Sequence, residues 1–213
     1  MIRLQRPRRP QALRTNATAW KKEFIVWRAH PSPRPRDPRR YKNSAIKNAL
    51  RGASFAKCAY CESHLEHVYP ADVEHILPKS ARPALVVEWG NLAWVCFECN
   101  NRKGIYYSTT VPLVDPYSED PSDHLFFAGD LCVWKPGSER GRLTVTQLAL
   151  SRSPLVERRR ERLQQLGSLL DLWMKTTDPL AKAAVRAEAE AFGQPSAEYA
   201  AACAAYLRLC APW

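Results

Sequence analysis

Long apolar runs are missing from this sequence. No stretch approaches the roughly 18–20 consecutive apolar residues that a membrane-spanning helix needs, and the opening residues MIRLQRPRRP hold four arginines in place of an apolar core. We therefore expect neither a membrane protein nor a secretory signal. The sequence also lacks an internal repeat and a glycine-rich phosphate-binding loop, so it gives no support to a repeat fold or to nucleotide binding through such a loop.

Acidic residues are scarce in the first quarter of the chain. Residues 1–57 contain 16 lysines and arginines against two acids, Glu23 and Asp37, whereas residues 58–213 contain 16 against 19. The first part therefore carries +14 and the rest −3, which together give the net charge of +11. A basic arm on a nearly neutral body favours a polyanion such as nucleic acid as partner. A solvated or disordered tail is the alternative.

Cysteine, in contrast, is frequent, with seven in 213 residues. In the absence of an export signal, these cysteines indicate a reducing compartment, and we expect a cytoplasmic protein. Paired Cys-x-x-Cys motifs in such a compartment are typical of metal sites rather than disulfides. Three cysteines stand outside such pairs, and we expect them to be small buried apolar residues: Cys132, Cys203 and Cys210.

Two Cys-x-x-Cys pairs predict a structural zinc site. Cys58 with Cys61 and Cys96 with Cys99 supply four thiolates, the ligand set that suits a tetrahedral zinc ion. The 34 residues between the pairs exceed the gap of a simple zinc ribbon, so this segment must hold folded structure. A site filled by four thiolates is closed, and we expect its zinc to be structural rather than catalytic. A reduced quartet without metal is the alternative.

The segment between the pairs carries a candidate reactive centre. His75 is the candidate general base, because imidazole titrates near neutral pH. Glu74 and Asn100 offer oxygen ligands that suit Mg²⁺ or Mn²⁺ better than zinc. Asn91 can hydrogen-bond locally and hold His75 in position. Three cations are candidates for contacts with phosphate groups: Lys79, Arg102 and Lys103.

The order of Glu74 and His75 raises a geometric question. Adjacent side chains of a regular strand point to opposite faces, so these two can face one phosphate only at a strand end or a bulge. Pro78 favours a strand end.

Two further histidines follow the first cysteine pair, and we interpret them as exposed loop residues, with phosphate or metal contact as the alternative: His64 and His67.

These motifs, in this order, resemble the HNH endonucleases with a ββα-metal fold. The shared pattern is Cys-x-x-Cys, an acid-His-x-x-Pro step, Asn-Leu and Cys-x-x-Cys-Asn-x-x-Lys. The resemblance implies that His75 is the general base, that Glu74 and Asn100 bind one divalent ion, and that Asn91 orients the histidine. It also implies a structural zinc ion on the four cysteines. Two positions depart from the commonest pattern, Glu74 where Asp is usual and Asn100 where His is usual.

A narrower resemblance extends from about residue 41 to about residue 170. Lys57 to Glu62, Val73 to Lys79, Trp89 to Leu92 and Leu113 to Pro116 are similar to the HNH nuclease subunit of Septu-type antiphage defence and of related retron-associated systems. This similarity implies an ATPase partner of the ABC/SMC-like type and cleavage of nucleic acid, DNA or, in some retron systems, tRNA. Asp115 and His124 also match, and we interpret them as fold residues.

The expected fold class is α+β, with a zinc-stapled ββα-metal core over 58–115. A basic arm with helices precedes it over 1–57, and a β-meander with a helical C-terminal region follows over 116–213. We expect residues 1–14 to be extended or disordered. The expected strands lie at 72–77, at 92–96 and in a meander over 124–148, and the expected helices lie at 15–29, at 41–52, near Cys99, from Ser153, at 179–192 and at 196–210.

Two faces and two functions follow from this organisation. Trp20, Phe24 and Trp27 recur on one face of the first helix, which we expect to face the core or a partner protein. The Leu- and Ala-rich C-terminal helices are a second candidate docking surface. The leading function is metal-dependent hydrolysis of nucleic acid. The alternative is a zinc-ribbon module that binds nucleic acid without cleaving it.

Overall fold

A computed structural model describes residues 1–65 and 71–213. Their contacts separate into two compact units, which we describe one at a time. One unit comprises Leu4–Ala59 and Leu65–Pro112, and the other comprises Met1–Arg3, Tyr60–His64 and Leu113–Trp213. The three-part division expected from the sequence stays a prediction. Within the described residues, no helix is both long and apolar enough to cross a membrane.

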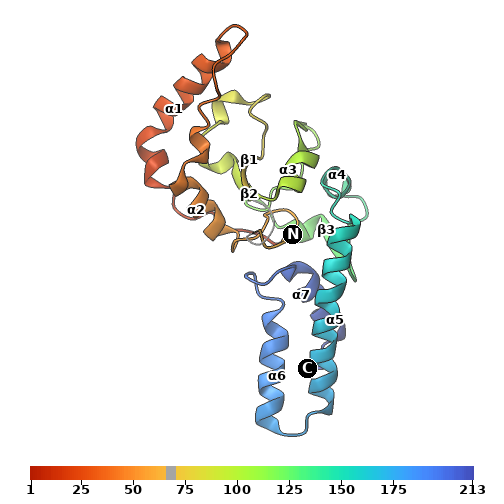
Figure 1. Cartoon of the computed structure of the whole chain (residues 1–213). Helices are drawn as coiled ribbons and strands as arrows, with labels where there is room; N and C mark the ends of the chain where they lie inside the picture. Colours follow the sequence, from red (N-terminus) through yellow and green to blue (C-terminus); the bar gives the residue numbers. More distant parts are fainter. Residues whose placement is uncertain (66–70) are drawn as a thin grey trace. The chain divides into compact units, whose positions relative to one another are not determined.

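A strand-strand-helix element forms the centre of the unit that begins at Leu4 (Figure 1). Strand β1 (Asp72–His75) pairs antiparallel with β2 (Leu92–Val95), with Asp72 opposite Val95 and His75 opposite Leu92. Helix α3 (Phe97–Lys103) follows β2 almost directly. This order confirms the ββα core predicted from the sequence.

Helices α1 (Gln11–Ala29) and α2 (Ser44–Ala53) supply much of the hydrophobic core of this unit. Phe24 is 3% exposed within that core, and Trp20 and Trp27 pack against it, so the aromatic face of the first helix faces the core as predicted. Ile46 and Leu50 of α2 are fully buried in the same cluster. The two strands are thereby fixed against a helical layer.

The N-terminal arm is more ordered than we expected. Helix α1 begins at Gln11, not near Thr15, because Leu13 is fully buried and supports an additional helical turn. The preceding residues are extended but anchored. The Arg6 guanidinium donates hydrogen bonds of 2.8 Å to the carbonyl oxygens of Trp89, Gly90 and Leu92. Residues 1–10 thus agree with the extended alternative of the prediction, whereas the prediction is wrong for 11–14, which are helical.

The other unit contains a single hairpin rather than a meander. Strands β3 (Leu125–Ala128) and β4 (Leu131–Trp134) pair antiparallel, as predicted. The third strand expected near 143–148 is wrong, because this segment belongs to helix α4 (Glu139–Gln147). The Ser138 Oγ accepts a hydrogen bond of 3.0 Å from the Gly141 N–H and caps the helix. Capping and burial thus outweigh the β-propensity of the Thr-Val-Thr sequence.

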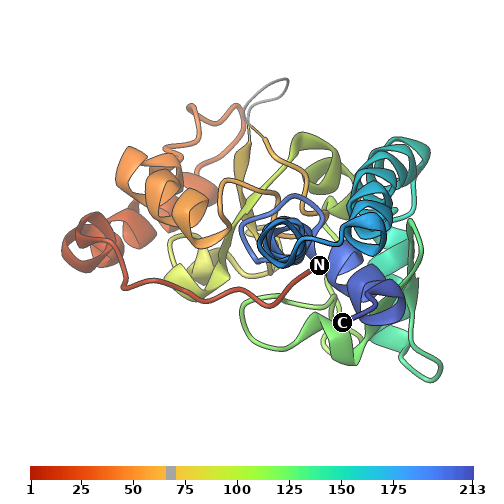
Figure 2. The ribbon, with the colours of Figure 1, turned by 90° about the horizontal axis from the view of Figure 1, so that it is seen from below.

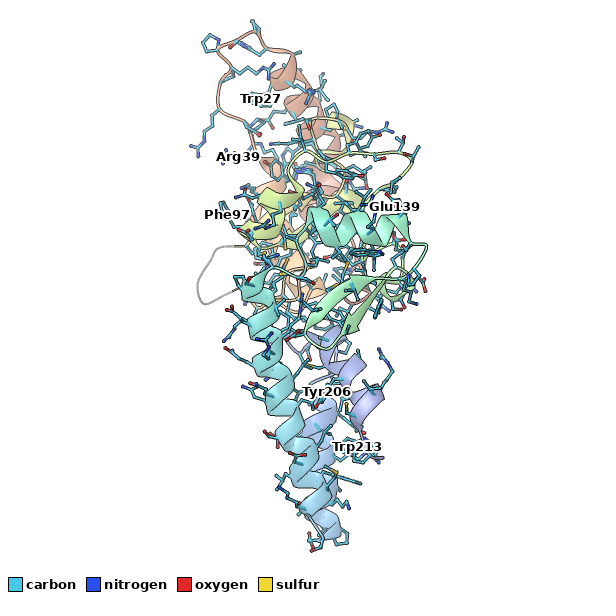
Figure 3. The ribbon with its side chains drawn as sticks, turned by 90° about the vertical axis from the view of Figure 1, so that its right-hand side faces the viewer. Trp27, Arg39, Phe97, Glu139, Tyr206 and Trp213 are labelled. Atoms are coloured by element: carbon cyan, nitrogen blue, oxygen red, sulfur yellow. The ribbon has the colours of Figure 1, made fainter. Side chains whose placement is uncertain are left out.

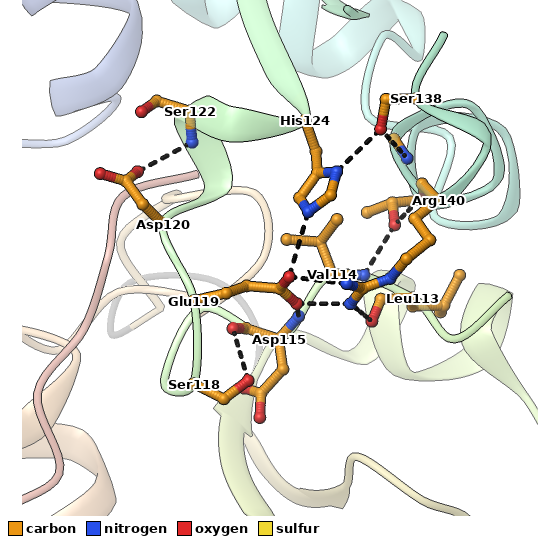
Figure 4. A network of polar contacts seen from close by, with 12 residues as sticks. Leu113, Val114, Asp115, Ser118, Glu119, Asp120, Ser122, His124, Ser138 and Arg140 are labelled. Atoms are coloured by element: carbon orange, nitrogen blue, oxygen red, sulfur yellow. Dashed lines mark hydrogen bonds and ion pairs between the residues drawn. The ribbon is translucent and has the colours of Figure 1, made fainter. Parts of the chain in front are cut away.

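A polar network joins the hairpin to α4 (Figure 4). The Glu119 carboxylate receives two hydrogen bonds from the Arg140 guanidinium, one of them 2.7 Å long, and lies 3.1 Å from His124 Nε2. The other ring nitrogen, Nδ1, is 2.8 Å from the Ser138 Oγ. The Asp115 N–H donates to Glu119 at 2.9 Å. These contacts support our interpretation of Asp115 and His124 as fold residues.

Three helices complete this unit. Helix α5 (Ser153–Lys175) packs against α6 (Pro179–Ala191) and α7 (Ala200–Cys210), and Figure 2 shows α6 nearly end-on with the other two beside it. The Asp178 side chain accepts a hydrogen bond of 2.7 Å from the Ala181 N–H and caps α6, which begins at residue 179 as predicted. Trp213, labelled in Figure 3, stacks near Trp173 with ring centroids 5.0 Å apart.

Candidate nuclease centre

Four cysteines form a compact cluster of sulfur atoms. The Sγ atoms of Cys58, Cys61, Cys96 and Cys99 all lie within 4.8 Å of one another, and all four residues are buried. Sulfur atoms around one tetrahedral zinc ion lie about 3.8 Å apart, given Zn–S bonds of about 2.3 Å, so the cluster is compatible with zinc after a small contraction. Cys96 also caps α3, because its Sγ accepts a hydrogen bond of 3.3 Å from the Cys99 N–H. The predicted four-cysteine cluster is confirmed.

The remaining cysteines and loop histidines are placed as follows. Cys132 and Cys203 are buried, as expected, whereas Cys210 is exposed, so the prediction for Cys210 is wrong. Cys210 is the last residue of α7 and lies outside the helical core. His64 is exposed. The prediction for His67 falls outside the described residues.

Glu74 and Lys103 form a buried ion pair. The Lys103 ammonium is 2.7 Å from the Glu74 Oε1 and donates a second hydrogen bond of 2.9 Å to the backbone carbonyl of His75. Lys103 is only 1% exposed and Glu74 8% exposed. Burial raises the pKa of Glu74, and the positive charge of Lys103 acts against this shift. A contact of Lys103 with phosphate, as predicted, would require this pair to open.

His75 ends β1 and has a different set of neighbours. Its Nε2 lies 2.9 Å from the Val86 carbonyl oxygen, and its ring meets the Tyr41 ring edge-on with centroids 4.6 Å apart. The side chain is 5% exposed. Burial lowers the pKa of His75 to about 4, so the imidazole is neutral at neutral pH. The strand does end here, as expected, but in this structure the imidazole and the Glu74 carboxylate have separate partners.

Asn91 forms side-chain hydrogen bonds with the backbone of the segment that follows β1. Its Oδ1 accepts a hydrogen bond of 2.7 Å from the Leu77 N–H, and its Nδ2 donates to the Leu77 and Leu85 carbonyls at 3.0 and 3.3 Å. The Asn91 carbonyl also accepts from the Ile76 N–H at 2.9 Å. The residues directly after His75 are thereby tied to the turn before β2, which is the local bonding expected of this side chain.

The other predicted site residues lie on α3 and on the segment after β1. Asn100 is half-buried in α3, one residue after Cys99. Arg102 is exposed and paired with Glu98 at 2.6 Å. The Lys79 ammonium is held by Asp37 at 2.5 Å and by the Tyr41 hydroxyl at 2.9 Å.

Sequence reasoning missed the neighbours that surround His75 and Lys79. Tyr41 contacts both residues, through its ring and its hydroxyl, although in the sequence it is only the first residue of the helix expected at 41–52. Val86 contributes a main-chain carbonyl, which no sequence motif encodes. Lys79 and Lys103 also have carboxylate partners far away along the chain, Asp37 and Glu74. Spacing alone does not predict such long-range pairs.

Comparison with known proteins agrees with this geometry. Residues 58–105 match the model of the HNH endonuclease family, and this segment contains the cysteine cluster and the Glu74–His75 step. The chain therefore contains an HNH domain. Over 131 residues it is 36% identical to the Septu protein PtuB of Bacillus thuringiensis, covering 59% of this chain and 46% of that protein.

A second relative gives the same result. The Septu protein PtuB of Bacillus mycoides (strain KBAB4) is 30% identical over 150 residues, which cover 56% of this chain and 51% of the relative. The chain thus spans about half the length of the curated relatives that it matches.

Proposed function

We propose that this chain is a metal-dependent HNH endonuclease that hydrolyses phosphodiester bonds of nucleic acid. The observation that carries the proposal is the match of residues 58–105 to the HNH endonuclease family, with a buried acid-histidine step at the end of β1. A pure binding module has no need for a neutral, buried imidazole beside a carboxylate. The four-cysteine cluster serves as a structural zinc site that holds the start of α3.

His75 is the general base in this proposal. A carbonyl oxygen can only accept a hydrogen bond, so the contact with Val86 fixes the proton on Nε2 and leaves the lone pair on Nδ1. Nδ1 takes a proton from a water molecule, whose oxygen attacks phosphorus while the bond to the 3′ oxygen breaks. The products carry 5′-phosphate and 3′-hydroxyl ends. The depressed pKa of His75 keeps the base unprotonated at neutral pH.

Glu74 and Asn100 are the proposed ligands of one divalent ion, Mg²⁺ or Mn²⁺. Their oxygen donors are of the hard type that these ions prefer. Glu74 accepts a hydrogen bond from Lys103 at Oε1, so an ion bound there would share this carboxylate with the lysine. Such an ion supplies charge stabilisation for the phosphorane and the leaving oxygen. Asn91 holds the segment after His75 in place.

The proposed nucleic-acid contacts are Lys79, Arg102 of α3 and cations of the first 57 residues. The likeness to two Septu proteins further suggests a role in antiphage defence, with an ATPase of the ABC/SMC-like type as partner. The exposed apolar residues of the C-terminal helices offer a docking surface for it, with Leu172 49%, Met174 58% and Leu180 83% exposed. DNA is the first substrate to test and tRNA the second. The cytoplasmic location stays a prediction.

The test is cleavage of plasmid DNA and of total tRNA by the purified protein with Mg²⁺ or Mn²⁺. We expect His75→Ala to abolish cleavage while the zinc content stays that of the wild type; loss of the buried ring lowers the melting temperature, so cleavage is measured well below the melting transition of the variant. His30→Ala is the matched control, because His30 is exposed and lies outside the nuclease centre. Full activity of His75→Ala would contradict the assignment of the base.

A zinc module that binds without cleaving is the second candidate, favoured by the engagement of Glu74 with Lys103. The same assay decides between the two once it is repeated with the proposed ATPase partner and ATP. Cleavage under any of these conditions excludes the binding module. Tight binding of nucleic acid with no cleavage under all of them supports it and contradicts the nuclease.

A further inference from the structure

A cavity of about 560 Å³ lies in the unit that contains the C-terminal helices, apart from every residue assigned to the nuclease centre. Its walls come from the chain start, the turn before β3, the strand β3 itself and helix α7. Figure 2 shows the chain start and α7 side by side. A volume of this size falls within the range of small-molecule binding pockets, roughly 300–1,000 Å³.

One part of the cavity lining is apolar, and we call this part the slot. Ala201, Ala204 and Ala205 line it and recur at helical spacing on one face of α7. All three are only half-buried, so this helix face is not covered by packing. Phe126 and Phe127 of β3 also line the cavity, and Phe126 is 43% exposed. Alanine methyl groups and the exposed ring of Phe126 in one lining favour a planar ring system as ligand.

A second part of the cavity lining is cationic, and it includes Arg208, which continues the alanine face of α7. Arg3, Lys135 and Arg208 line it, and none of the three forms an ion pair with a carboxylate among the residues that the structure describes. Asp120 is the one acidic side chain of the lining, so the four charges sum to +2. The Ser122 N–H, assisted by the charges of Arg3 and Lys135, keeps the pKa of Asp120 below its usual value, so Asp120 stays ionised at neutral pH. The ligand that balances this lining carries about two negative charges.

We propose that this cavity binds a phosphorylated nucleoside, either free or as the terminal nucleotide of a strand. The base occupies the slot between the α7 alanines and Phe126. The phosphate group meets Arg3, Lys135 and Arg208. Asp120 accepts hydrogen bonds from the base or the sugar. This site is separate from the nuclease centre, so its occupancy is measurable whether or not the chain cleaves nucleic acid.

The experiment is isothermal titration calorimetry of the full chain with four probes. These are adenosine monophosphate, adenosine, inorganic phosphate and a single-stranded DNA octamer with a 5′-phosphate. We expect adenosine monophosphate to bind at least tenfold more tightly than adenosine or phosphate alone. Only the nucleotide has both a base for the slot and a phosphate group for the cations. Tighter binding of the octamer than of the mononucleotide would assign the site to strand ends, and the reverse order would assign it to free nucleotides.

Two variants locate the binding in the cavity. Arg208→Ala removes a cation and Ala205→Leu fills the slot, and we expect each to weaken binding of adenosine monophosphate at least tenfold. The matched controls are Lys175→Ala and Ala187→Leu, which alter residues on α5 and α6 outside the cavity. Binding that is absent in the wild type, that phosphate alone reproduces, or that survives in both cavity variants would overturn the proposal. Circular dichroism spectra identical to the wild type show that the variants are folded.

Discussion

The ammonium of Lys103 and the carboxylate of Glu74 are withdrawn from water together. A buried ion pair repays its desolvation only when its geometry is good and further hydrogen bonds are present. Lys103 satisfies this condition, because it also donates to the His75 carbonyl. The pair therefore ties the end of α3 to the end of β1, at the point where both predicted reactive residues lie. In this structure the ion pair holds the backbone at Glu74 and His75 against the end of α3.

Removal of Lys103 should accordingly destabilise the fold. We expect Lys103→Met to lower the free energy of unfolding by about 3–5 kcal/mol, because it leaves the Glu74 carboxylate buried without a partner. Arg102→Met is the matched control, since Arg102 is the neighbouring cation and its pair with Glu98 is exposed. That control should cost at most about 1 kcal/mol. Equal losses in urea unfolding of the two variants would contradict a structural role for the buried pair.

The Cys61 sulfur has an outer partner that bears on zinc affinity. The Cys61 thiol lies 3.3 Å from the Ser63 Oγ, which in turn lies 3.0 Å from the Tyr199 hydroxyl. Burial raises the pKa of Tyr199, so its hydroxyl keeps its proton and can donate to Ser63. Once Cys61 is a thiolate ligand, the Ser63 hydroxyl is free to donate to the sulfur. The chain of hydroxyls would thus stabilise the charged form of the ligand.

Ser63→Ala is therefore expected to weaken zinc binding by about 10- to 100-fold, the usual effect of a lost outer hydrogen bond. The measurement is competition for zinc with a chromogenic chelator at neutral pH. Ser118→Ala, at an exposed serine far from the cysteines in the sequence, should leave the affinity unchanged. Equal zinc affinity of the two variants would show that Ser63 does not act on the sulfur.

At the scale of elements, local signals predicted most of the fold. The cysteine spacing and the short apolar runs located β1, β2 and α3, because each of these elements is determined within a few residues. Helix α4 was missed because its stability depends on distant contacts. Thr144 is fully buried, and its hydroxyl accepts a hydrogen bond of 2.9 Å from the Val114 N–H. A Cβ atom at position 141 would approach the His124 carbonyl oxygen to 2.3 Å, so glycine is required where α4 meets the hairpin.

The Glu119 carboxylate links these elements in a pH-dependent way. Burial alone would raise its pKa, but the hydrogen bonds and charge of Arg140, with further bonds from Asp115 and His124, lower it below the usual 4.5. A lowered folded-state pKa gives stability that is present above pH 4.5 and is lost as the pH falls through the folded-state value. The junction of the hairpin and α4 should therefore weaken in acid.

Glu119→Gln tests this junction. We expect it to lower the free energy of unfolding by about 1–3 kcal/mol at neutral pH, because charged hydrogen bonds to Arg140 are lost. The difference from the wild type should shrink in acid, where Glu119 itself becomes neutral. Glu139→Gln is the control, because its pair with Arg142 is exposed. A loss of stability that stays constant from neutral to acidic pH would exclude the charge of Glu119 as its source.

At the scale of the whole molecule, net charge overstates the basic surface available to nucleic acid. Several cations of residues 1–57 serve the fold: Arg6 and Arg28 bind backbone carbonyls, and Arg40 and Lys42 pair with Glu23 and Asp72. The candidate nuclease centre shows the same limit of sequence reasoning. Motif order predicted its residues, but the partners of His75 and Lys103 depend on packing between segments far apart in the sequence.

The cations left on the outer face of α1 are the ones expected to meet phosphate groups. Arg14, Lys21 and Lys22 are exposed: at 100° per residue Lys22 lies opposite the face that holds Leu13 and Phe24, and Arg14 and Lys21 flank that face. Each lost contact with duplex DNA lowers the salt dependence of binding by about 0.9 in the slope of log K against log salt. Replacement of all three by glutamine should therefore lower that slope by about 2–3.

The measurement is fluorescence anisotropy of labelled duplex DNA across a salt series, with His75→Ala as the background so that the DNA stays intact. A control set of equal charge replaces three cations of α5 by glutamine: Arg158, Arg160 and Lys175. If both sets lower the slope equally, net charge alone explains the binding and the α1 face is not the contact. If only the α1 set lowers it, the basic N-terminal region contacts phosphate through this helix, and Arg6, Arg28, Arg40 and Lys42 belong to the fold.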